Sequence, residues 1–108
     1  PEIVFPVKTA LYLGLIINEA ATNFIKHGIS SVPDLRFSVT LSGDGIQNEY
    51  VLTIANNGPP VPEDVNFENP STLGMLIIRT MAAQIPASIH LETFPSPVYR
   101  LSFRVKVA

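Results

Sequence analysis

Hydrophobic residues between positions 7 and 25 recur with a period near 3.6, which is typical of a helix with a buried face. Pro6 has a ring-fixed φ suited to a first helical turn, and Gly28 is a residue type common just past a helix end. We therefore predict a long helix over residues 6–28. Its first half is apolar nearly all round, whereas its second half carries several polar side chains.

Alternating apolar and polar residues follow this helix and predict strands. The first strand is expected over residues 35–41 and the second over 50–55, with a turn at 42–45 between them. Because this connection is too short for a crossover helix, the two strands should be antiparallel. Residues 56–70 are rich in proline and asparagine, which predicts a loop.

A second helix and two more strands complete the pattern. Apolar residues at helical spacing predict a helix over 73–84, with Ser71 or Thr72 as its N-cap. Residues 88–93 and 98–106 follow as strands, the last with a clean alternation that buries one face of the sheet. This order predicts an α+β fold: a two-layer α/β sandwich with the helices on one face of a mainly antiparallel, mixed sheet.

Composition narrows the class of protein. The 108 residues, nearly half of them hydrophobic, suit a single domain over residues 1–108, which we expect to be a piece of a longer protein. A net charge of -2 provides no basic field for nucleic acid or an anionic membrane, and no apolar run is long enough to span a bilayer. The absence of cysteine excludes disulfides and thiolate metal sites and is compatible with a cytoplasmic location.

Four polar side chains emerge on one face of the first predicted helix. These side chains are Glu19, Asn23, Lys26 and His27. The last three follow Glu19 by four, seven and eight residues, which places all four on one side of a helix. An amide oxygen suits Mg²⁺, a carboxylate can orient or deprotonate a nucleophile, and the two basic side chains suit phosphate oxygens. The alternative is the ordinary solvated stripe of an amphipathic helix.

Two further segments have a composition that suits ligand contact. Residues 71–75 include Gly74 at the start of the second helix, where unpaired N–H groups attract anions, although ordinary helix capping is the alternative. Asn56 and Gly58 follow the second strand, where a side-chain amide could meet a purine edge. As an isolated motif, this pair is most often a turn.

Taken together and in this order, the segments resemble the three sequence boxes of the Bergerat-fold (GHKL) ATPases, which include histidine kinases, type II topoisomerases, heat-shock chaperones and mismatch-repair proteins. Residues 18–28 resemble the N box, 51–60 the G1 box, and 71–84 the G2 box with its helix. The resemblance covers nearly the whole chain. It implies a Bergerat ATP-binding fold, and the Asn-Glu start of the N box is similar to that of sensor histidine kinases.

The resemblance also implies roles for single residues. Glu19 corresponds to the catalytic base or polarising group of the family, and Asn23 corresponds to the Mg²⁺ ligand. Positions that correspond to nucleotide contacts are Asn23, Lys26, His27, Asn56, Gly58, Ser71, Thr72, Leu73 and Gly74.

The sequence departs from the family pattern around the adenine. Asn56 stands where the family has an aspartate that accepts a hydrogen bond from the adenine amino group, and Pro60 replaces the second glycine of the G1 box. Ser96 and Pro97 align with a Gly-Thr pair before the last strand. In contrast, the first predicted helix keeps the N-box residues that correspond to the metal and phosphate contacts of the family.

The resemblance implies the ATP-binding catalytic domain of a two-component sensor histidine kinase, which transfers the γ-phosphoryl group of ATP to a histidine on a separate dimerisation domain. Its cofactors would be ATP and Mg²⁺. Its partners would be that dimerisation domain and a response regulator, without nucleic acid or direct membrane contact. Two alternatives stay open: a degenerate, non-catalytic module that docks to a histidine phosphotransferase or response regulator, and an anti-sigma-factor serine kinase.

Overall fold

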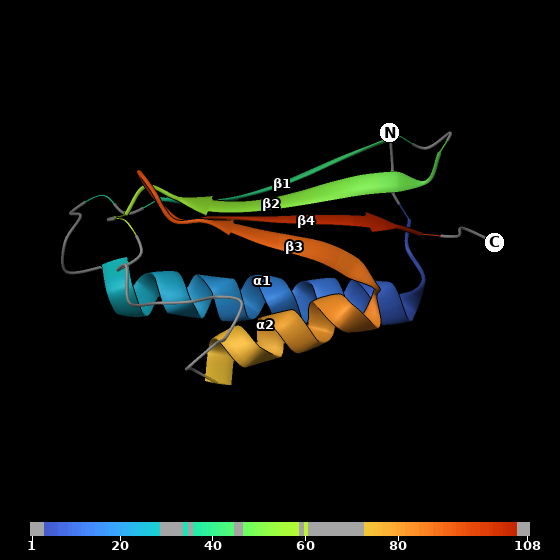
Figure 1. Cartoon of the computed structure of the whole chain (residues 1–108), viewed down its shortest axis with the longest axis horizontal. Coiled ribbons are helices and arrows are strands. Elements are labelled where there is room, and N and C mark those ends of the chain that lie inside the picture. The colour runs from blue at the N-terminus through green and yellow to red at the C-terminus, as the bar shows by residue number, and fades with distance from the viewer. Residues whose placement is uncertain are drawn as a thin grey trace.

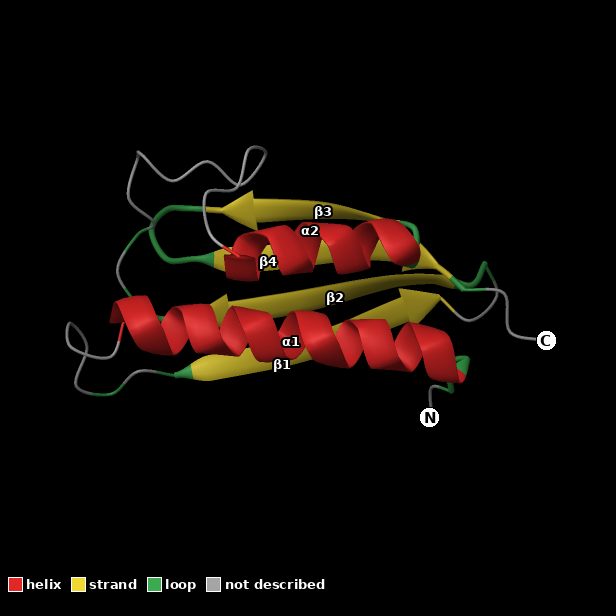
Figure 2. Ribbon diagram, turned by 90° about the horizontal axis from the view of Figure 1, so that it is seen from below, coloured by secondary structure: helices red, strands yellow, loops and turns green. Residues whose placement is uncertain are grey.

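The computed structural model describes residues 4–28, 34, 36–44, 47–58, 60 and 73–105. Two helices and four strands are formed: α1 (Val7–Gly28), β1 (Phe37–Asp44), β2 (Glu49–Asn56), α2 (Leu73–Gln84), β3 (Ala87–Glu92) and β4 (Val98–Arg104). The strands make one sheet in the order β1-β2-β4-β3, and both helices lie along one face of it (Figure 1, Figure 2). The predicted two-layer α+β sandwich is confirmed.

All strand pairs of the described sheet are antiparallel: β1 with β2, β2 with β4, and β3 with β4. The expectation of a mixed sheet is therefore wrong for the described residues. β2 and β3 run in the same direction, but β4 lies between them, so the two parallel strands never pair (Figure 2). The two central strands, β2 and β4, thus come from different halves of the chain.

Both helices agree with the prediction. α1 begins one residue after Pro6, and α2 has the predicted bounds. The proposed N-cap, Ser71 or Thr72, lies outside the described residues, as does most of the predicted loop over 56–70. Neither described helix combines the length and apolar character needed to cross a membrane.

The β1–β2 hairpin differs from the prediction, because the turn expected at 42–45 is largely strand. The ladder between β1 and β2 extends to the pair formed by Asp44 and Glu49. Gly43 lies opposite Tyr50, and a Cβ atom at Gly43 would overlap the Tyr50 ring. Glycine at this position therefore allows an aromatic ring to lie against the neighbouring strand, which is one of the reasons for glycine inside a strand.

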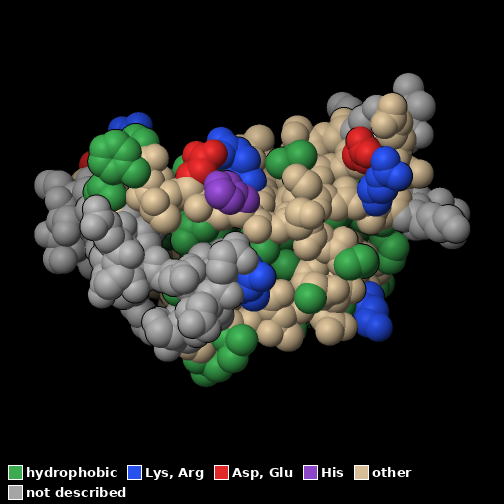
Figure 3. Space-filling view, viewed as in Figure 1, with side chains coloured by type: hydrophobic (Ala, Val, Ile, Leu, Met, Phe, Trp, Pro, Cys, Tyr) green, Lys and Arg blue, Asp and Glu red, His purple; other side chains and the backbone are tan. Residues whose placement is uncertain are grey.

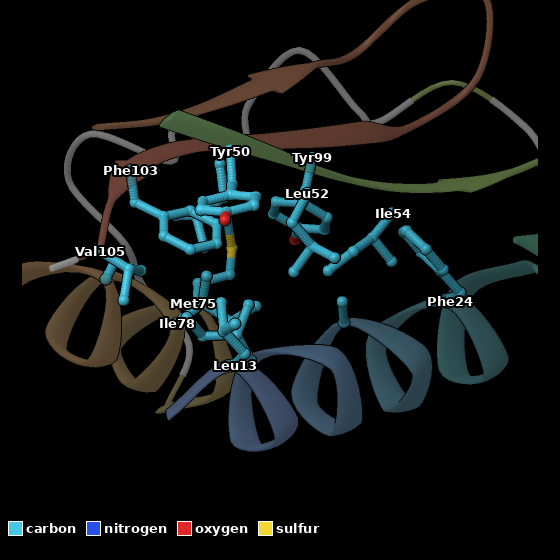
Figure 4. Close-up of a cluster of buried hydrophobic side chains, with 14 residues drawn as sticks. Leu13, Phe24, Tyr50, Leu52, Ile54, Met75, Ile78, Tyr99, Phe103 and Val105 are labelled. Atoms are coloured by element: carbon cyan, nitrogen blue, oxygen red, sulfur yellow. The ribbon is translucent and has the colours of Figure 1, made fainter. Parts of the chain in front are cut away.

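The hydrophobic core lies between the helices and the sheet (Figure 4). The helices contribute residues three and four positions apart, and β2 and β4 contribute alternate residues, as expected for one buried face on each element. The core residues of these elements are Leu13, Ile16, Ala20, Phe24, Met75, Ile78, Ala82, Tyr50, Leu52, Ile54, Tyr99, Leu101 and Phe103. The intervening side chains of β4 are exposed, so its predicted alternation is confirmed.

The outer face of the sheet carries charges in pairs of opposite sign. Arg100 donates a hydrogen bond to Glu92, and Arg104 donates two to Glu49, each across neighbouring strands. Figure 3 shows acidic and basic side chains side by side at two places on one face of the molecule. These pairs are solvent-exposed and contribute little to stability, but they cancel charge locally.

The contact between Gly43 and Tyr50 generates the first prediction. Gly43→Ala should lower the free energy of unfolding by about 1–3 kcal/mol, because the added methyl group must displace the ring. Urea unfolding measures the change, and Ser42→Ala at the exposed neighbouring position is the control. The same glycine substitution should cost less in a Tyr50→Leu background. Equal stability of Gly43→Ala and the wild type would contradict the assigned packing.

Candidate functional site

The predicted site residues that the structure describes lie at one end of the molecule. α1 and α2 run in opposite directions, so the C-terminal half of α1 lies beside the start of α2 (Figure 1). The end of β2 and the loop between β3 and β4 lie at this same end (Figure 2). The fold therefore brings together segments that are far apart in the sequence.

Gly74, in the first turn of α2, lies directly against Glu19 and Asn23 of α1. A Cβ atom at Gly74 would be 3.1 Å from Asn23 Oδ1 and 3.2 Å from Glu19 Oε2. Both oxygen atoms thus lie close to the start of α2, and glycine, which has no side chain, allows this close approach. This contact joins two of the segments that the sequence singled out.

The donor set at this contact fits a particular kind of cation. Glu19 and Asn23 are half-buried and provide a carboxylate and an amide oxygen, both hard ligands. The described residues contain no group of three His, Cys, Asp or Glu side chains able to hold a metal by themselves. Such a sparse set suits Mg²⁺, which keeps several waters and is shared with phosphate groups. The first turn of α2 adds backbone N–H groups that attract anions.

Tyr99 of β4 is a member of this site that the sequence analysis did not single out. Its ring is buried, with 4% of the residue exposed, and its hydroxyl is hydrogen-bonded to the side-chain amide of Asn23. Burial raises the pKa of Tyr99 above the ordinary value of 10.0, and the hydrogen bond to Asn23 opposes this only in part. The phenol is therefore neutral at physiological pH. In the sequence, the alternation of apolar and polar residues along β4 indicates that Tyr99 faces the core, but it does not indicate a contact with Asn23.

The end of β2 is tied to the loop before β4. Asn56 Oδ1 accepts a hydrogen bond from the backbone N–H of Gly58 at 2.8 Å. The hydroxyl of Ser96 donates to the Gly58 carbonyl at 2.7 Å, and the backbone N–H of Asn56 donates to the Pro97 carbonyl at 3.3 Å. Three of the positions that depart from the family pattern, Asn56, Ser96 and Pro97, therefore belong to one hydrogen-bonded group.

Asn57 anchors the same corner to the start of β1. Its Oδ1 accepts a hydrogen bond from the backbone N–H of Arg36 at 2.6 Å, and its Nδ2 donates to the Asp34 carbonyl at 2.9 Å. Its own N–H donates to the Arg36 carbonyl at 3.3 Å. The chain thus leaves β2 from a position that is fixed on both sides.

The remaining predicted contacts are not joined to this site by described side chains. Leu73, the first residue of α2, is 72% exposed, so its side chain is not packed against Glu19 and Asn23 as Gly74 is. The side chains of Lys26 and His27 lie outside the described part of the chain, and so do the residues Ser71 and Thr72.

Comparison with known proteins points to histidine kinases. Blue-light-activated histidine kinase 2 of Erythrobacter litoralis is 32% identical over 90 residues, which cover 80% of this chain and 25% of that protein. A solved blue-light activated histidine kinase of Erythrobacter litoralis matches with a TM-score of 0.87 and 22% identity, over 97% of this chain and 33% of that one. The solved catalytic domain of histidine kinase ThkA matches with a TM-score of 0.67 and 16% identity, over 88% of this chain and 67% of that one.

These matches confirm the resemblance inferred from the three boxes. The sequence match extends over most of this chain, and the solved structures share its fold. The chain spans about a quarter of the length of the curated relative. No protein-family model matches the chain.

The burial of Tyr99 generates a prediction on pH. A tyrosine whose pKa is raised by folding keeps its proton in the native state while the unfolded chain loses it, so the native state becomes less stable as pH rises through and above about 10. The free energy of unfolding in urea should be measured for the wild type and for Tyr99→Phe between about pH 8 and about pH 11. All other groups titrate in both proteins, so the difference between the two pH profiles is the contribution of Tyr99. The wild type should lose stability more steeply. Parallel pH profiles would contradict the raised pKa.

Proposed function

We propose that this chain, a histidine-kinase-type catalytic domain by both sequence and fold, binds Mg-ATP and presents its γ-phosphoryl group to a histidine on a separate dimerisation domain. The observation that carries the proposal is the convergence of Asn23 Oδ1 and Glu19 Oε2 on Gly74. A carboxylate, an amide oxygen and the N-terminal turn of a helix meet there. This combination suits a divalent cation and a polyphosphate held together.

Each member of the site has a distinct proposed role. Asn23 holds Mg²⁺ through its amide oxygen, and the backbone N–H groups in the first turn of α2, where Gly74 carries no side chain, bind phosphate oxygens. Glu19 orients the acceptor imidazole or takes its proton. Lys26 and His27, one helical turn beyond Asn23, contact phosphate oxygens. When bound, Mg²⁺ neutralises charge on the phosphates, and most of the remaining catalysis is positioning.

The partners follow from the same proposal. The acceptor histidine lies on a dimerisation domain, and the phosphoryl group then passes to a response regulator, in the cytoplasm. The outer face of the sheet supports this choice of partners over nucleic acid, because Arg100 and Arg104 on that face are each paired with a carboxylate. We expect the isolated chain not to phosphorylate itself, because the acceptor histidine is supplied by another domain.

A non-catalytic docking module is the second candidate, and the arrangement of Asn56 favours it. Asn56 Oδ1 already accepts the Gly58 N–H, so it keeps one lone pair for the adenine amino group and, unlike an aspartate, carries no negative charge. The nucleotide would therefore bind more weakly than with a carboxylate at this position. A domain of this kind would keep the fold and the contact surface without turnover.

Titration calorimetry with a non-hydrolysable ATP analogue, with and without Mg²⁺, tests the leading proposal. Wild-type protein should bind more tightly with Mg²⁺ than without it, and Asn23→Ala should lose at least about tenfold in Mg-dependent affinity, because the metal loses a protein ligand. Thr22→Ala, at the exposed neighbouring position, is the matched control. Absence of binding by folded wild-type protein would favour the docking module, and an unchanged affinity of Asn23→Ala would refute the metal role.

Asn56→Asp tests the weakness at the adenine end. A carboxylate can accept both the Gly58 N–H and the adenine amino group, and charge-assisted hydrogen bonds are about twice as strong as neutral ones, so we expect about fivefold tighter nucleotide binding. Asn48→Asp makes the same chemical change just before the opposite end of β2 and should leave affinity unchanged. If Asn56→Asp binds the nucleotide no more tightly than the wild type, Pro60 or Pro97 limits binding instead.

A further inference from the structure

Tyr99 lies near the start of β4, one of the two central strands of the sheet, and contacts the candidate metal ligand Asn23. It is paired with Ile54 of β2 on one side and with Leu91 of β3 on the other. Its ring packs against Phe24, with ring centroids 5.8 Å apart, and Phe24 is the neighbour of Asn23 in α1. The ring is therefore held from three sides, and its hydroxyl has a fixed position relative to the Asn23 amide.

The geometry at Gly74 gives the direction of the hydrogen bond between Tyr99 and Asn23. A Cβ atom at Gly74 would be closer to Asn23 Oδ1 than to Asn23 Nδ2, so the amide oxygen lies toward α2. The amide nitrogen is the atom left for the Tyr99 oxygen, and because an amide nitrogen can only donate, the Asn23 N–H is the donor and the Tyr99 oxygen is the acceptor. The amide nitrogen is thus engaged toward the sheet.

The other end of the amide is turned toward α2. A Cβ atom at Gly74 would be 3.1 Å from Asn23 Oδ1 and 3.6 Å from Asn23 Nδ2, so the oxygen is the nearer atom. A reversed amide would place N–H donors toward the cation, which an amide can bind only through its oxygen. Orientation of this amide therefore decides whether Asn23 can serve as a ligand.

We propose that Tyr99 is a positioning residue: its buried hydroxyl oxygen holds the Asn23 amide nitrogen and so keeps Asn23 Oδ1 directed toward the first turn of α2, where the proposed function puts a divalent cation. This inference rests on the proposed function, because it assigns a role to Tyr99 in the metal dependence of nucleotide binding. Phenylalanine would fill the same volume between β2 and β3 without orienting the amide. The specific contribution of tyrosine is its oxygen atom.

Tyr99→Phe is the test, because it keeps the ring and removes the oxygen. We expect the Mg-dependent affinity for the ATP analogue to fall about threefold to tenfold, the effect of losing one hydrogen bond, while affinity without Mg²⁺ is unchanged. Tyr50→Phe is the matched control, since Tyr50 is also buried and faces the helices but packs against Phe5 and Phe103. A merely structural role for Tyr99 would weaken both affinities together, and that result would overturn the proposal.

A second readout separates this proposal from the proposed function. The side-chain amide signals of Asn23 in nitrogen–proton correlation spectra, identified by their loss in Asn23→Asp, should shift in Tyr99→Phe and stay in place in Tyr50→Phe. Unchanged Asn23 signals in Tyr99→Phe would overturn the positioning role. If wild-type protein binds no nucleotide, the proposed function fails, and with it the metal-directed role of Tyr99, while the Asn23 signals still establish whether the amide is held.

Discussion

Two helices share the single apolar face of the sheet, and the burial of this face determines where the polar residues of α1 emerge. The helix positions that contact the sheet include Ala20 and Phe24, both buried. Glu19 and Asn23 precede them by one residue each, so they are rotated by about 100° from the core toward α2. Packing of the apolar stripe thus directs the polar pair to the seam between the two helices.

The seam also depends on the small size of Gly74. Helices approach one another most closely where no side chain intervenes, and here the first turn of α2 lies against two oxygen atoms of α1. The N-terminus of a helix carries a partial positive charge, so the carboxylate of Glu19 is electrostatically suited to this position. One contact therefore combines close helix packing with favourable electrostatics.

Local patterns in the sequence were sufficient to predict most elements, because helical and strand periods are properties of neighbouring residues. The bounds of α2 and the alternation in β4 are examples. The end of β1 was not predictable in this way. Gly43 has the composition of a turn residue, and its partner Tyr50 is known only once the ladder between the two strands is formed.

The site was predictable in part. Glu19 and Asn23 were singled out by their spacing, and their relation to Gly74 was suggested by the resemblance to a family rather than by any local pattern. The contact of Asn23 with Tyr99 was not predictable, because alternation shows that a strand residue points inward but not which atom it meets. The same holds for the hydrogen bonds that connect Gly58 with Ser96.

The hydrogen bond between Asn23 and Tyr99 also bears on the alignment of α1 along the sheet. The buried residues among the described side chains of α1 are Leu13, Ile16, Ala20 and Phe24, and a slide of the helix by about one turn, or 5.4 Å, would still bring apolar residues onto the sheet, with Ala20 in the place of Phe24. Such a slide would also bring Glu19 to the place of Asn23 and set a carboxylate against the buried phenol. A buried polar group that loses its partner is costly. This amide would therefore act, together with side-chain volume, as a register mark for the native alignment of α1.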